Sequence, residues 1–300
     1  MSHTMLLSAS PKTSILSLSD GRQLGYAQYG AENGTPLLYL HGLPGSRLEC
    51  QLIDKPARQM GISVVAVDRP GYGSTTPLAS DSLLAWTADI EQLTNHLGWP
   101  QFAIIGFSGG GPCALTCAYQ LVGRVTRVAL IGGLGPVYER PLLHSMGWLA
   151  RMSFFMARHA PELMEIIVGY PVTVLAQYKP QLLINALAAL NGQPDKQCLH
   201  REATYNAFLR SLPACFAQGA RGAIQDLTLF QRPWAVPFEN IDIPVWLWHG
   251  DRDRVVPLTH SQHLAGQLGN ARLICMPGEA HFSLPVRHMQ RLLADFMATA

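Results

Sequence analysis

The chain has 300 residues, a formal net charge of +2 at pH 7, 48% hydrophobic residues and only 14% charged residues. This length allows one large α/β domain with an insertion, and the low share of charged residues points to extensive buried or concave apolar surface rather than to disorder. Without a Lys/Arg block or a strong net charge, nothing in the sequence supports nucleic acid as a partner.

The first half of the chain alternates short apolar runs with helical patterns. It begins with Asp20-Gly21 between two extended runs, which is typical of a β-hairpin. Strands that alternate with helices form a mostly parallel sheet joined by crossover connections. We therefore expect an α/β fold with strands over residues 36–40, 62–67, 102–105 and 125–131, and helices over residues 48–60, 82–98 and 112–119.

This alternation stops at Leu134. From there to about Trp234 the sequence is rich in Met, Phe and Leu, has a helical character and is broken by prolines at positions 141, 161, 171, 180, 194 and 213. Alternation then resumes with strands over 244–248 and 271–276 and helices over 258–268 and 285–299. We therefore expect one α/β core domain, residues 1–133 and 235–300, and a helical cap domain over residues 134–234.

Six cysteines show neither a C-x-x-C pair nor the spacing of a zinc site, which indicates free thiols in a reducing compartment. The N-terminal segment MSHTMLLSASPKTS lacks a basic start and a long apolar run, so we expect no signal peptide. No apolar run reaches the roughly 18 residues of a membrane span. These observations predict a cytoplasmic protein without a cofactor or a metal site.

Residues 102–112, FAIIGFSGGGP, match G-x-S-x-G between an expected strand and an expected helix. In this context the serine occupies a strained turn, the glycines relieve crowding, and the helix N-terminus favours the negative charge of an acyl-transfer intermediate. Ser108 is therefore the candidate nucleophile. The alternative is a serine that merely caps the helix.

A serine hydroxyl needs a base to take its proton and a carboxylate to orient that base. His281 follows the last strand, and two carboxylates, Asp251 and Asp253, follow the strand before it. We favour Asp253, which lies deeper in the loop, and expect Asp251 to pin that loop. The chain order Ser108, Asp253, His281 is the one expected for a nucleophile elbow. Among the other histidines, we expect His41 and His249 to be structural and His288 to lie on the surface. The remaining histidines are expected to be ordinary helix or cap residues.

An oxyanion hole requires two backbone amides that point at the developing charge. One should be the amide of Gly109, directly after the candidate nucleophile. The other should come from the loop over residues 41–46, and we favour Leu43. Glycines 42 and 45 allow the backbone of this loop to approach the site closely.

Together these residues resemble the α/β-hydrolase superfamily, specifically its cap-bearing branch of esterases, epoxide hydrolases and proline-iminopeptidase-like enzymes. The resemblance covers nearly the whole chain outside the cap. It implies an eight-stranded sheet, a lid between strands six and seven, and a catalytic triad of Ser108, Asp253 and His281. The segments that carry it are HGLPGS (41–46), DRPGYGS (68–74), GFSGGG (106–111), HGDRDRVVP (249–257) and GEAH (278–281).

Three departures refine the expected activity. Epoxide hydrolases and haloalkane dehalogenases carry aspartate where this chain has Ser108, so their chemistry is not expected. Iminopeptidases usually have a second glycine at Leu43 and tryptophan at Gly109, which weakens a peptidase interpretation. We therefore expect a serine hydrolase that cleaves a carboxylic ester or thioester through an acyl-enzyme. The alternatives are an amide hydrolase of the proline-iminopeptidase type, a C–C bond hydrolase, and a ligand-binding receptor with little turnover.

The candidate substrate-binding residues are Phe107, Met146, Trp148, Phe155 and Phe282. The early cap concentrates apolar side chains, and methionine adapts to varied shapes, so we expect an apolar wall around a small, mainly apolar ester. We expect no membrane partner. The sequence leaves the oligomeric state open, and a homodimer is one possibility.

The amide alternative would require a carboxylate to hold a substrate amine. We expect the three glutamates of the cap that come into question, Glu162, Glu165 and Glu202, to be solvated on helix faces instead.

Overall fold

The computed structural model describes residues 11–298. The expectation of no signal peptide concerns a segment whose first ten residues lie outside this part. The same holds for Thr299, the expected last residue of the final helix.

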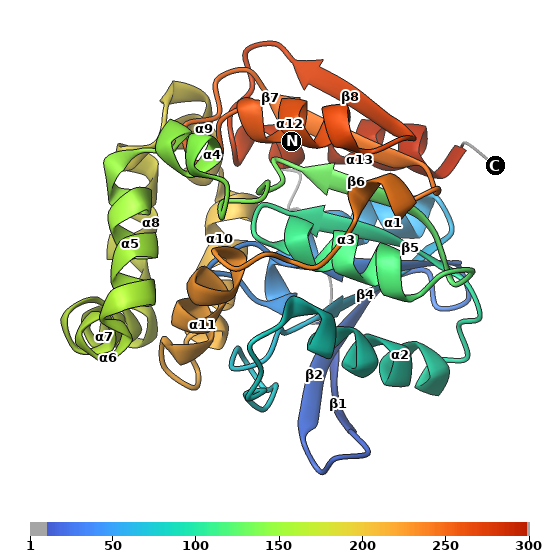
Figure 1. Cartoon of the computed structure of the whole chain (residues 1–300), viewed down its shortest axis with the longest axis horizontal. Coiled ribbons are helices and arrows are strands. Elements are labelled where there is room, and N and C mark those ends of the chain that lie inside the picture. Colours follow the sequence, from blue (N-terminus) through green and yellow to red (C-terminus); the bar gives the residue numbers. More distant parts are fainter. Residues whose placement is uncertain (1–10, 299–300) are drawn as a thin grey trace, which may run out of the picture.

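The core is an eight-stranded sheet with the strand order β1-β2-β4-β3-β5-β6-β7-β8 (Figure 1). Strand β1 forms the expected hairpin with β2, and Gly21 in its turn has a φ of 85°. Strand β2 is antiparallel to β4, and all later neighbours are parallel, which confirms the expected fold class. The strands are β1 (Lys12–Ser17), β2 (Gln23–Gly30), β3 (Thr35–Leu40), β4 (Ile62–Val67), β5 (Phe102–Phe107), β6 (Val125–Ile131), β7 (Val245–Gly250) and β8 (Ala271–Met276).

Helices cover both faces of this sheet (Figure 1). Strand β5 shows the consequence for the sequence: Phe102 and Ile104 pack into the core on one face, and Ala103 and Ile105 into the core on the other. A strand buried on both faces therefore reads as a continuous apolar run. One face carries η1 (Arg47–Ile53), α1 (Asp54–Gln59) and α13 (Ser283–Ala298), and the other carries η2 (Leu83–Trp86), α2 (Thr87–His96), α3 (Gly110–Gln120) and α12 (Thr259–Gln267).

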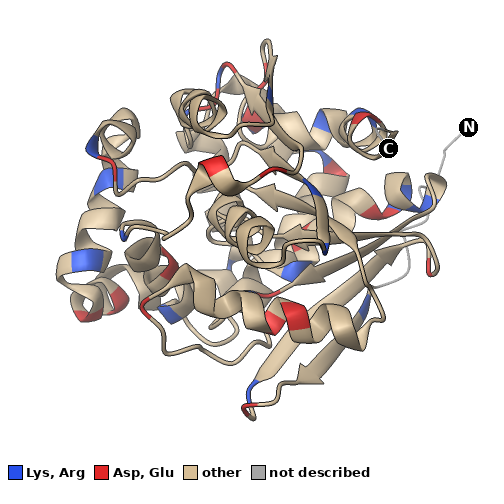
Figure 2. Cartoon of the chain, turned by 45° about the vertical axis from the view of Figure 1, so that its right-hand side comes forward, with Lys and Arg blue, Asp and Glu red and all other residues tan. Residues whose placement is uncertain are grey.

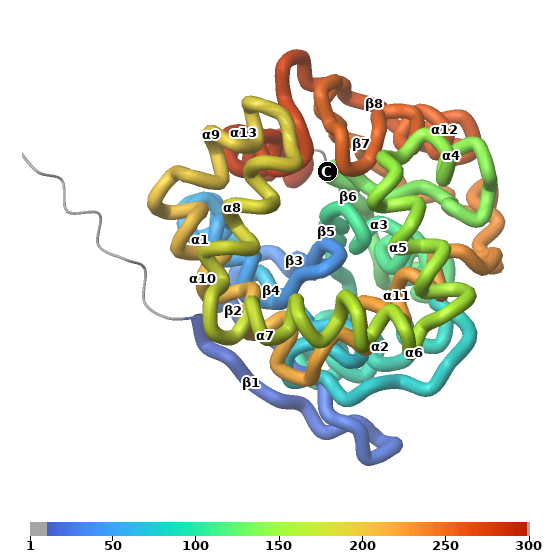
Figure 3. The backbone as a smooth tube through the Cα atoms, turned by 90° about the vertical axis from the view of Figure 1, so that its left-hand side faces the viewer, coloured from blue at the N-terminus to red at the C-terminus, as the bar shows by residue number. Residues whose placement is uncertain are grey.

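All regular structure between β6 and β7 is helical, as expected for the insertion, and the last element before β7 is the short 3-10 helix η4 (Phe238–Asn240). We call residues 134–234 the lid; their division from the core as a separate domain stays a prediction. Figure 3 shows lid helices around the ends of β3 and β5. The lid contains α4 (Arg140–Ser145), α5 (Trp148–His159), α6 (Pro161–Met164), the π-helical turn η3 (Glu165–Gly169), α7 (Tyr170–Tyr178), α8 (Pro180–Leu190), α9 (Gln193–Leu199), α10 (Glu202–Cys215) and α11 (Arg221–Phe230).

Basic and acidic residues are interspersed over the view of Figure 2, in keeping with the small net charge. All six cysteines are free thiols, as expected, and Cys113 and Cys117 are both buried in the core beneath α3. Within residues 11–298, every helix is too short or too polar to span a bilayer.

A buried ion pair joins the lid to the loop that follows β4. The Arg69 side chain is 1% exposed, and its Nε donates to Oδ2 of Asp226 on α11 at 2.9 Å. Tyr72 donates a hydrogen bond to the same oxygen at 2.7 Å. The guanidinium also donates to the carbonyls of His41 and Gly42, so one side chain connects the lid to the loop after β3.

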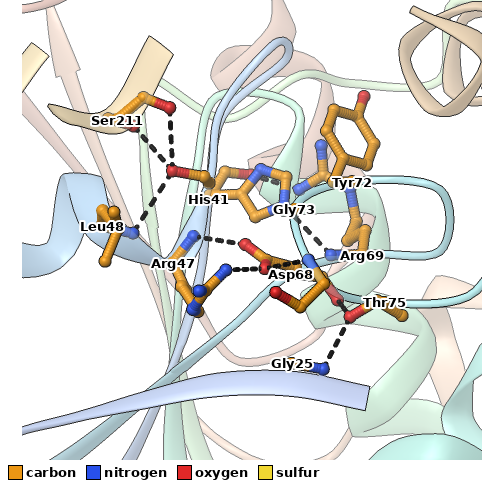
Figure 4. Close-up of polar contacts among 12 residues, drawn as sticks. Gly25, His41, Arg47, Leu48, Asp68, Arg69, Tyr72, Gly73, Thr75 and Ser211 are labelled. Atoms are coloured by element: carbon orange, nitrogen blue, oxygen red, sulfur yellow. Dashed lines mark hydrogen bonds and ion pairs between the residues drawn. The ribbon is translucent and has the colours of Figure 1, made fainter. Parts of the chain in front are cut away.

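The loop after β3 has a second contact with the lid. The Ser46 hydroxyl lies 2.8 Å from that of Ser211 and donates to the Ser211 carbonyl on α10 at 3.1 Å (Figure 4). Beside it, Arg47 is paired with the buried carboxylate of Asp68. This loop is therefore held by buried polar groups from both the core and the lid.

The Arg69–Asp226 pair should stabilise the position of the lid on the core. We expect Asp226→Ala to lower the free energy of unfolding by about 3–5 kcal/mol, because it leaves the Arg69 charge buried and unpaired. The control is Asp81→Ala, which removes the exposed partner of Arg232 in another ion pair between core and lid. This change should cost about 0–1 kcal/mol. Urea unfolding measures both, and equal losses would contradict the prediction.

Candidate active site

Ser108 lies in the turn between β5 and α3 with a strained backbone. Its φ is 52°, in the left-handed region that non-glycine residues rarely adopt. The turn is held by three hydrogen bonds of 3.0 Å: the Ser108 amide donates to the Ile131 carbonyl, and the Ser108 carbonyl accepts from the amides of Gly111 and Leu134. These bonds maintain a conformation that would otherwise cost about 1–3 kcal/mol.

The glycines around Ser108 are required by close backbone approach. A Cβ on Gly106 would lie 2.7 Å from the carbonyl oxygen of Gly110, which is closer than real Cβ contacts. A Cβ on Gly110 would clash with the carbonyl oxygen of Leu40 at the end of β3. The G-x-S-x-G pattern is therefore needed for β5 and α3 to meet at this turn and for α3 to begin beside the end of β3.

Asp253 and His281 form a buried pair beyond the ends of β7 and β8. The Nδ1 atom of His281 lies 2.7 Å from Oδ2 of Asp253, and the two residues are 2% and 8% exposed. The other carboxylate oxygen of Asp253 accepts from the amides of Val255 and Val256, both at 2.9 Å. The carboxylate is thus fixed by its own loop and aimed at the imidazole.

Asp251 has the different position expected for it. Its carboxylate accepts a hydrogen bond from the Gly278 amide at 2.7 Å, and the residue is exposed. It therefore joins the two loops that carry Asp253 and His281 without contacting the imidazole. The structure brings Asp253, not Asp251, to His281.

The neighbours of Ser108 contact this pair. The ring of Phe107 lies 5.0 Å from the ring of His281, measured between centroids. On the other side, Gly132 follows Ile131 and lies so close that a Cβ there would be 3.2 Å from both Oδ2 of Asp253 and Nδ1 of His281. The three predicted residues therefore lie at the ends of β5, β7 and β8, on one edge of the sheet.

Electrostatics favour a charged Asp253 and a basic His281. Burial disfavours the imidazolium, but the charge and hydrogen bond of Asp253, with further charges from Asp195 and Glu49, outweigh it and raise the pKa of His281 above its usual value. Burial likewise opposes ionisation of Asp253. The charge of His281 and hydrogen bonds from His281 and His249 nevertheless hold the pKa of Asp253 well below its usual value.

Two amides predicted to form an oxyanion hole lie beside Ser108. A Cβ on Gly109 would be 3.3 Å from the Leu43 nitrogen and 2.6 Å from the Leu43 Cβ, so the two backbones are in close contact. In the part of the chain that the structure describes, neither amide donates a hydrogen bond. Both donors are therefore free to bind an oxyanion.

Sequence reasoning missed Glu49, which supports the loop that carries Leu43. Its Oε1 accepts hydrogen bonds from the Gly42 amide at 2.8 Å and the Tyr39 hydroxyl at 3.0 Å. Burial raises the pKa of Glu49 to about 7, although both hydrogen bonds favour the carboxylate. No motif spacing marks this residue, because its role depends on the fold of η1 under the loop.

An apolar cavity of about 280 Å³ opens at Ser108 between the core and the lid. Among the described residues that line it, none is charged. It is lined by Leu43, Pro44, Ser108, Gly109, Leu134, Met146, Ala150, Ser153, Phe154, Met164, Val168, Gly169, Val172, Phe216, Ala220, Ala223, Ile224, Leu227, Val255 and Val256.

One of the five candidate substrate-binding residues, Met146, lines this cavity. Trp148 and Phe155 do not: they are 65% and 58% exposed on the outer face of α5, because that helix carries apolar side chains on both faces. Phe107 and Phe282 do not line it either, and instead pack against the His281 ring. They support the imidazole rather than the cavity wall.

Comparisons with known proteins by sequence and by structure point to the same family. The family model described as the alpha/beta hydrolase fold matches residues 35–287. A non-heme haloperoxidase of Rhodococcus erythropolis is 26% identical over 268 residues, which cover 88% of this chain and 90% of that protein. A pimeloyl-[acyl-carrier protein] methyl ester esterase of Aromatoleum aromaticum is 28% identical over 219 residues, covering 73% and 80%. The crystal structure of a bromoperoxidase from Bacillus anthracis matches with a TM-score of 0.72 at 19% identity, covering 96% of this chain and all of that one (100%).

Histidine titration by NMR should separate His281 from the structural His260. We expect the His281 pKa to lie above 6.5, so that the ring becomes neutral only above that pH. Burial lowers the pKa of His260 to about 4, so the His260 ring should stay neutral over the pH range in which His281 titrates. Asp253→Asn should lower the His281 pKa, because it removes the charge that offsets burial. An unchanged His281 pKa in this variant would contradict the assigned pairing.

Proposed function

The chain belongs to the α/β-hydrolase fold family, and from this premise we propose that it is a serine hydrolase that cleaves small, mainly apolar carboxylic esters or thioesters through an acyl-enzyme. The observation that carries the proposal is the buried 2.7 Å contact between His281 and Asp253, at the edge of the sheet where the strained Ser108 faces an apolar cavity. Nucleophile, base and orienting carboxylate are the three groups that acyl transfer to serine requires.

In the acylation step, the Ser108 hydroxyl attacks the ester carbonyl carbon. His281 takes the hydroxyl proton through Nε2, because its Nδ1 atom is engaged by Asp253. The carbonyl oxygen becomes an oxyanion and accepts hydrogen bonds from the amides of Leu43 and Gly109. When the intermediate collapses, the C–O bond to the alcohol breaks and His281 returns the proton to the departing oxygen.

Deacylation repeats the same chemistry with water. His281 removes a proton from a water molecule, which attacks the acyl-enzyme carbonyl, and the same two amides bind the second oxyanion. Collapse releases the carboxylic acid and returns the proton to Ser108. The low pKa of Asp253 keeps its carboxylate charged throughout, so that it balances the imidazolium that forms twice in each cycle.

The cavity favours an apolar acyl or alcohol group of moderate size. Its volume of about 280 Å³ is roughly twice that of the ~150 Å³ apolar cavity that binds benzene in an engineered protein. An apolar cavity wall that excludes water also strengthens the hydrogen bonds to an oxyanion. A substrate with a short aliphatic chain or one aromatic ring matches this size and chemistry.

The described residues that line the cavity offer no charged group to a substrate amine, which favours an ester over an N-terminal peptide. The described lining residues include no carboxylate. Glu162 and Glu202 are exposed, and Glu165 is paired with Arg221 at 2.8 Å. An amine placed in this cavity would be buried without a partner, at a large cost in free energy.

The Ser108 hydroxyl should be essential. We expect Ser108→Ala to lower kcat/KM for p-nitrophenyl butyrate by at least about 10⁴-fold and to abolish labelling by a fluorophosphonate probe, since the nucleophile is missing. Ser153 lines the same cavity but donates to the Leu149 carbonyl at 3.0 Å. Ser153→Ala should therefore still be labelled. Retained turnover in Ser108→Ala, or labelling lost only in Ser153→Ala, would refute the proposal.

The dependence of kcat/KM on acyl-chain length should show whether the acyl group binds in the cavity. We expect kcat/KM for p-nitrophenyl esters to rise from acetate to hexanoate by up to about fourfold per methylene, which corresponds to the transfer of roughly 0.8 kcal/mol per CH₂ out of water. Ala223→Phe should fill the cavity and lower the hexanoate-to-acetate ratio. Ala186→Phe, on the exposed face of α8, is the size-matched control. A ratio that is the same in both variants would place the acyl chain elsewhere.

A further inference from the structure

One lid residue contacts the segment that carries His281. Asp195, in the first turn of α9, is only 1% exposed. Its Oδ1 accepts hydrogen bonds from the amides of Phe282 at 2.9 Å and Ser283 at 2.8 Å. These are the two residues that directly follow His281, so a lid carboxylate binds the backbone of the segment from the base onward.

This contact takes the place of a local helix cap. The first amides of a helix have no partner within the helix, and the residue before it usually supplies an oxygen. Phe282 precedes α13 and has no such oxygen, so Asp195 supplies it from α9. From the opposite side, the Ser283 hydroxyl accepts from the Ala280 amide at 2.7 Å. Two side chains therefore accept hydrogen bonds from the backbone amides on either side of His281, namely Ser283 and, from the lid, Asp195.

The second oxygen of Asp195 has no obvious structural purpose. Within residues 11–298, Oδ2 is buried and has no hydrogen-bond partner. A buried carboxylate with an unpaired oxygen is costly, and an asparagine would satisfy both amides without a buried charge. The negative charge itself therefore calls for an explanation, and the cationic form of His281 is the charge that it can stabilise.

We propose that Asp195 is a positioning residue that acts through His281, holding the backbone of the catalytic histidine and stabilising its imidazolium from the lid. The triad is then complete only while α9 is docked on the start of α13. A displaced α9 would leave the helix uncapped and remove one negative charge from the surroundings of His281. This inference rests on the proposed function, because it assigns His281 the role of base.

The surroundings of His281 agree with such a division of roles. Asp253 faces the imidazole from the loop after β7, Glu49 from η1 and Asp195 from α9, while the flanking rings of Phe107 and Phe282 are uncharged. Burial lowers the pKa of His281, Asp253 has the largest opposing effect, and Asp195 and Glu49 add to it.

The surroundings of Asp195 raise its pKa overall, although several contacts act in the opposite direction. Burial raises its pKa above the usual value, and repulsion by Asp253 adds to this effect. The two amide hydrogen bonds and the charge of His281 oppose it. The carboxylate is thus most favourable when His281 is protonated, which is the state that arises during acyl transfer.

The test compares Asp195→Asn with Asp251→Asn in the full chain. Asp195→Asn keeps an acceptor for the two amides and removes the charge, so the acid limb of kcat/KM against pH should move to lower pH. The value of kcat should fall about tenfold, the equivalent of one pKa unit, with little change in KM. Asp251→Asn removes an exposed negative charge whose carboxylate binds the amide of Gly278, in the loop that also carries His281. This change should leave the pH profile unchanged.

Asp195→Ala separates positioning from folding. It removes charge and cap together, and should lower kcat further than Asp195→Asn. Rates are normalised to the fraction of sites titrated by a fluorophosphonate probe, so that unfolded protein does not count. A normalised kcat equal to that of the unsubstituted protein in both variants, or an unshifted acid limb in Asp195→Asn, would overturn the proposal.

A failure of the proposed function gives a different result. If the unsubstituted protein is neither labelled at Ser108 nor active on esters, the serine-hydrolase assignment fails by itself. The electrostatic part of the inference is then tested by histidine NMR, which requires no turnover. A lower His281 pKa in Asp195→Asn than in Asp251→Asn supports it, and equal values overturn it.

Discussion

The left-handed backbone of Ser108 is the constraint on which the site depends. It is accommodated because β5, α3 and the end of β3 approach so closely that only glycine fits at positions 106 and 110. The same turn is bound to the end of β6 through Ile131 and to the start of the lid through Leu134. Ser108, the neighbouring strand and the start of the lid therefore form one rigid unit, and the paired Asp253 and His281 lie beside it.

The lid is joined to the loops that carry Leu43 and His281 by polar groups rather than by apolar packing alone. Asp226 reaches the loop of Leu43 through Arg69, Ser211 reaches it through Ser46, and Asp195 reaches the His281 segment. Buried polar contacts are sensitive to geometry, because a shift that breaks one leaves an unpaired group. The lid therefore has a well-defined position on the core, and this position is coupled to both the loop that carries Leu43 and the segment that carries His281.

Much of the fold could be predicted from the sequence because its signals are local. The expected strands at 62–67, 125–131 and 271–276 coincide with β4, β6 and β8, since each is a short β-rich run bounded by turn residues. The triad could be proposed because parallel strands bring their carboxyl ends to one edge. What the sequence did not reveal depends on tertiary contacts. Trp148 and Phe155 face outward because apolar content does not reveal which face of α5 is buried, and the contacts of Glu49 and Asp195 arise only when distant segments meet.

The order of the strands also has a consequence for how the protein is made. Strands β6 and β7 are neighbours in the sheet, yet the whole lid lies between them in the chain, and more than half of the chain separates Ser108 from His281. Contacts between such distant residues form late, because long loops must close first. During synthesis Ser108 leaves the ribosome well before His281. A nascent chain therefore keeps Ser108 apart from Asp253 and His281 until its last two strands have joined the sheet.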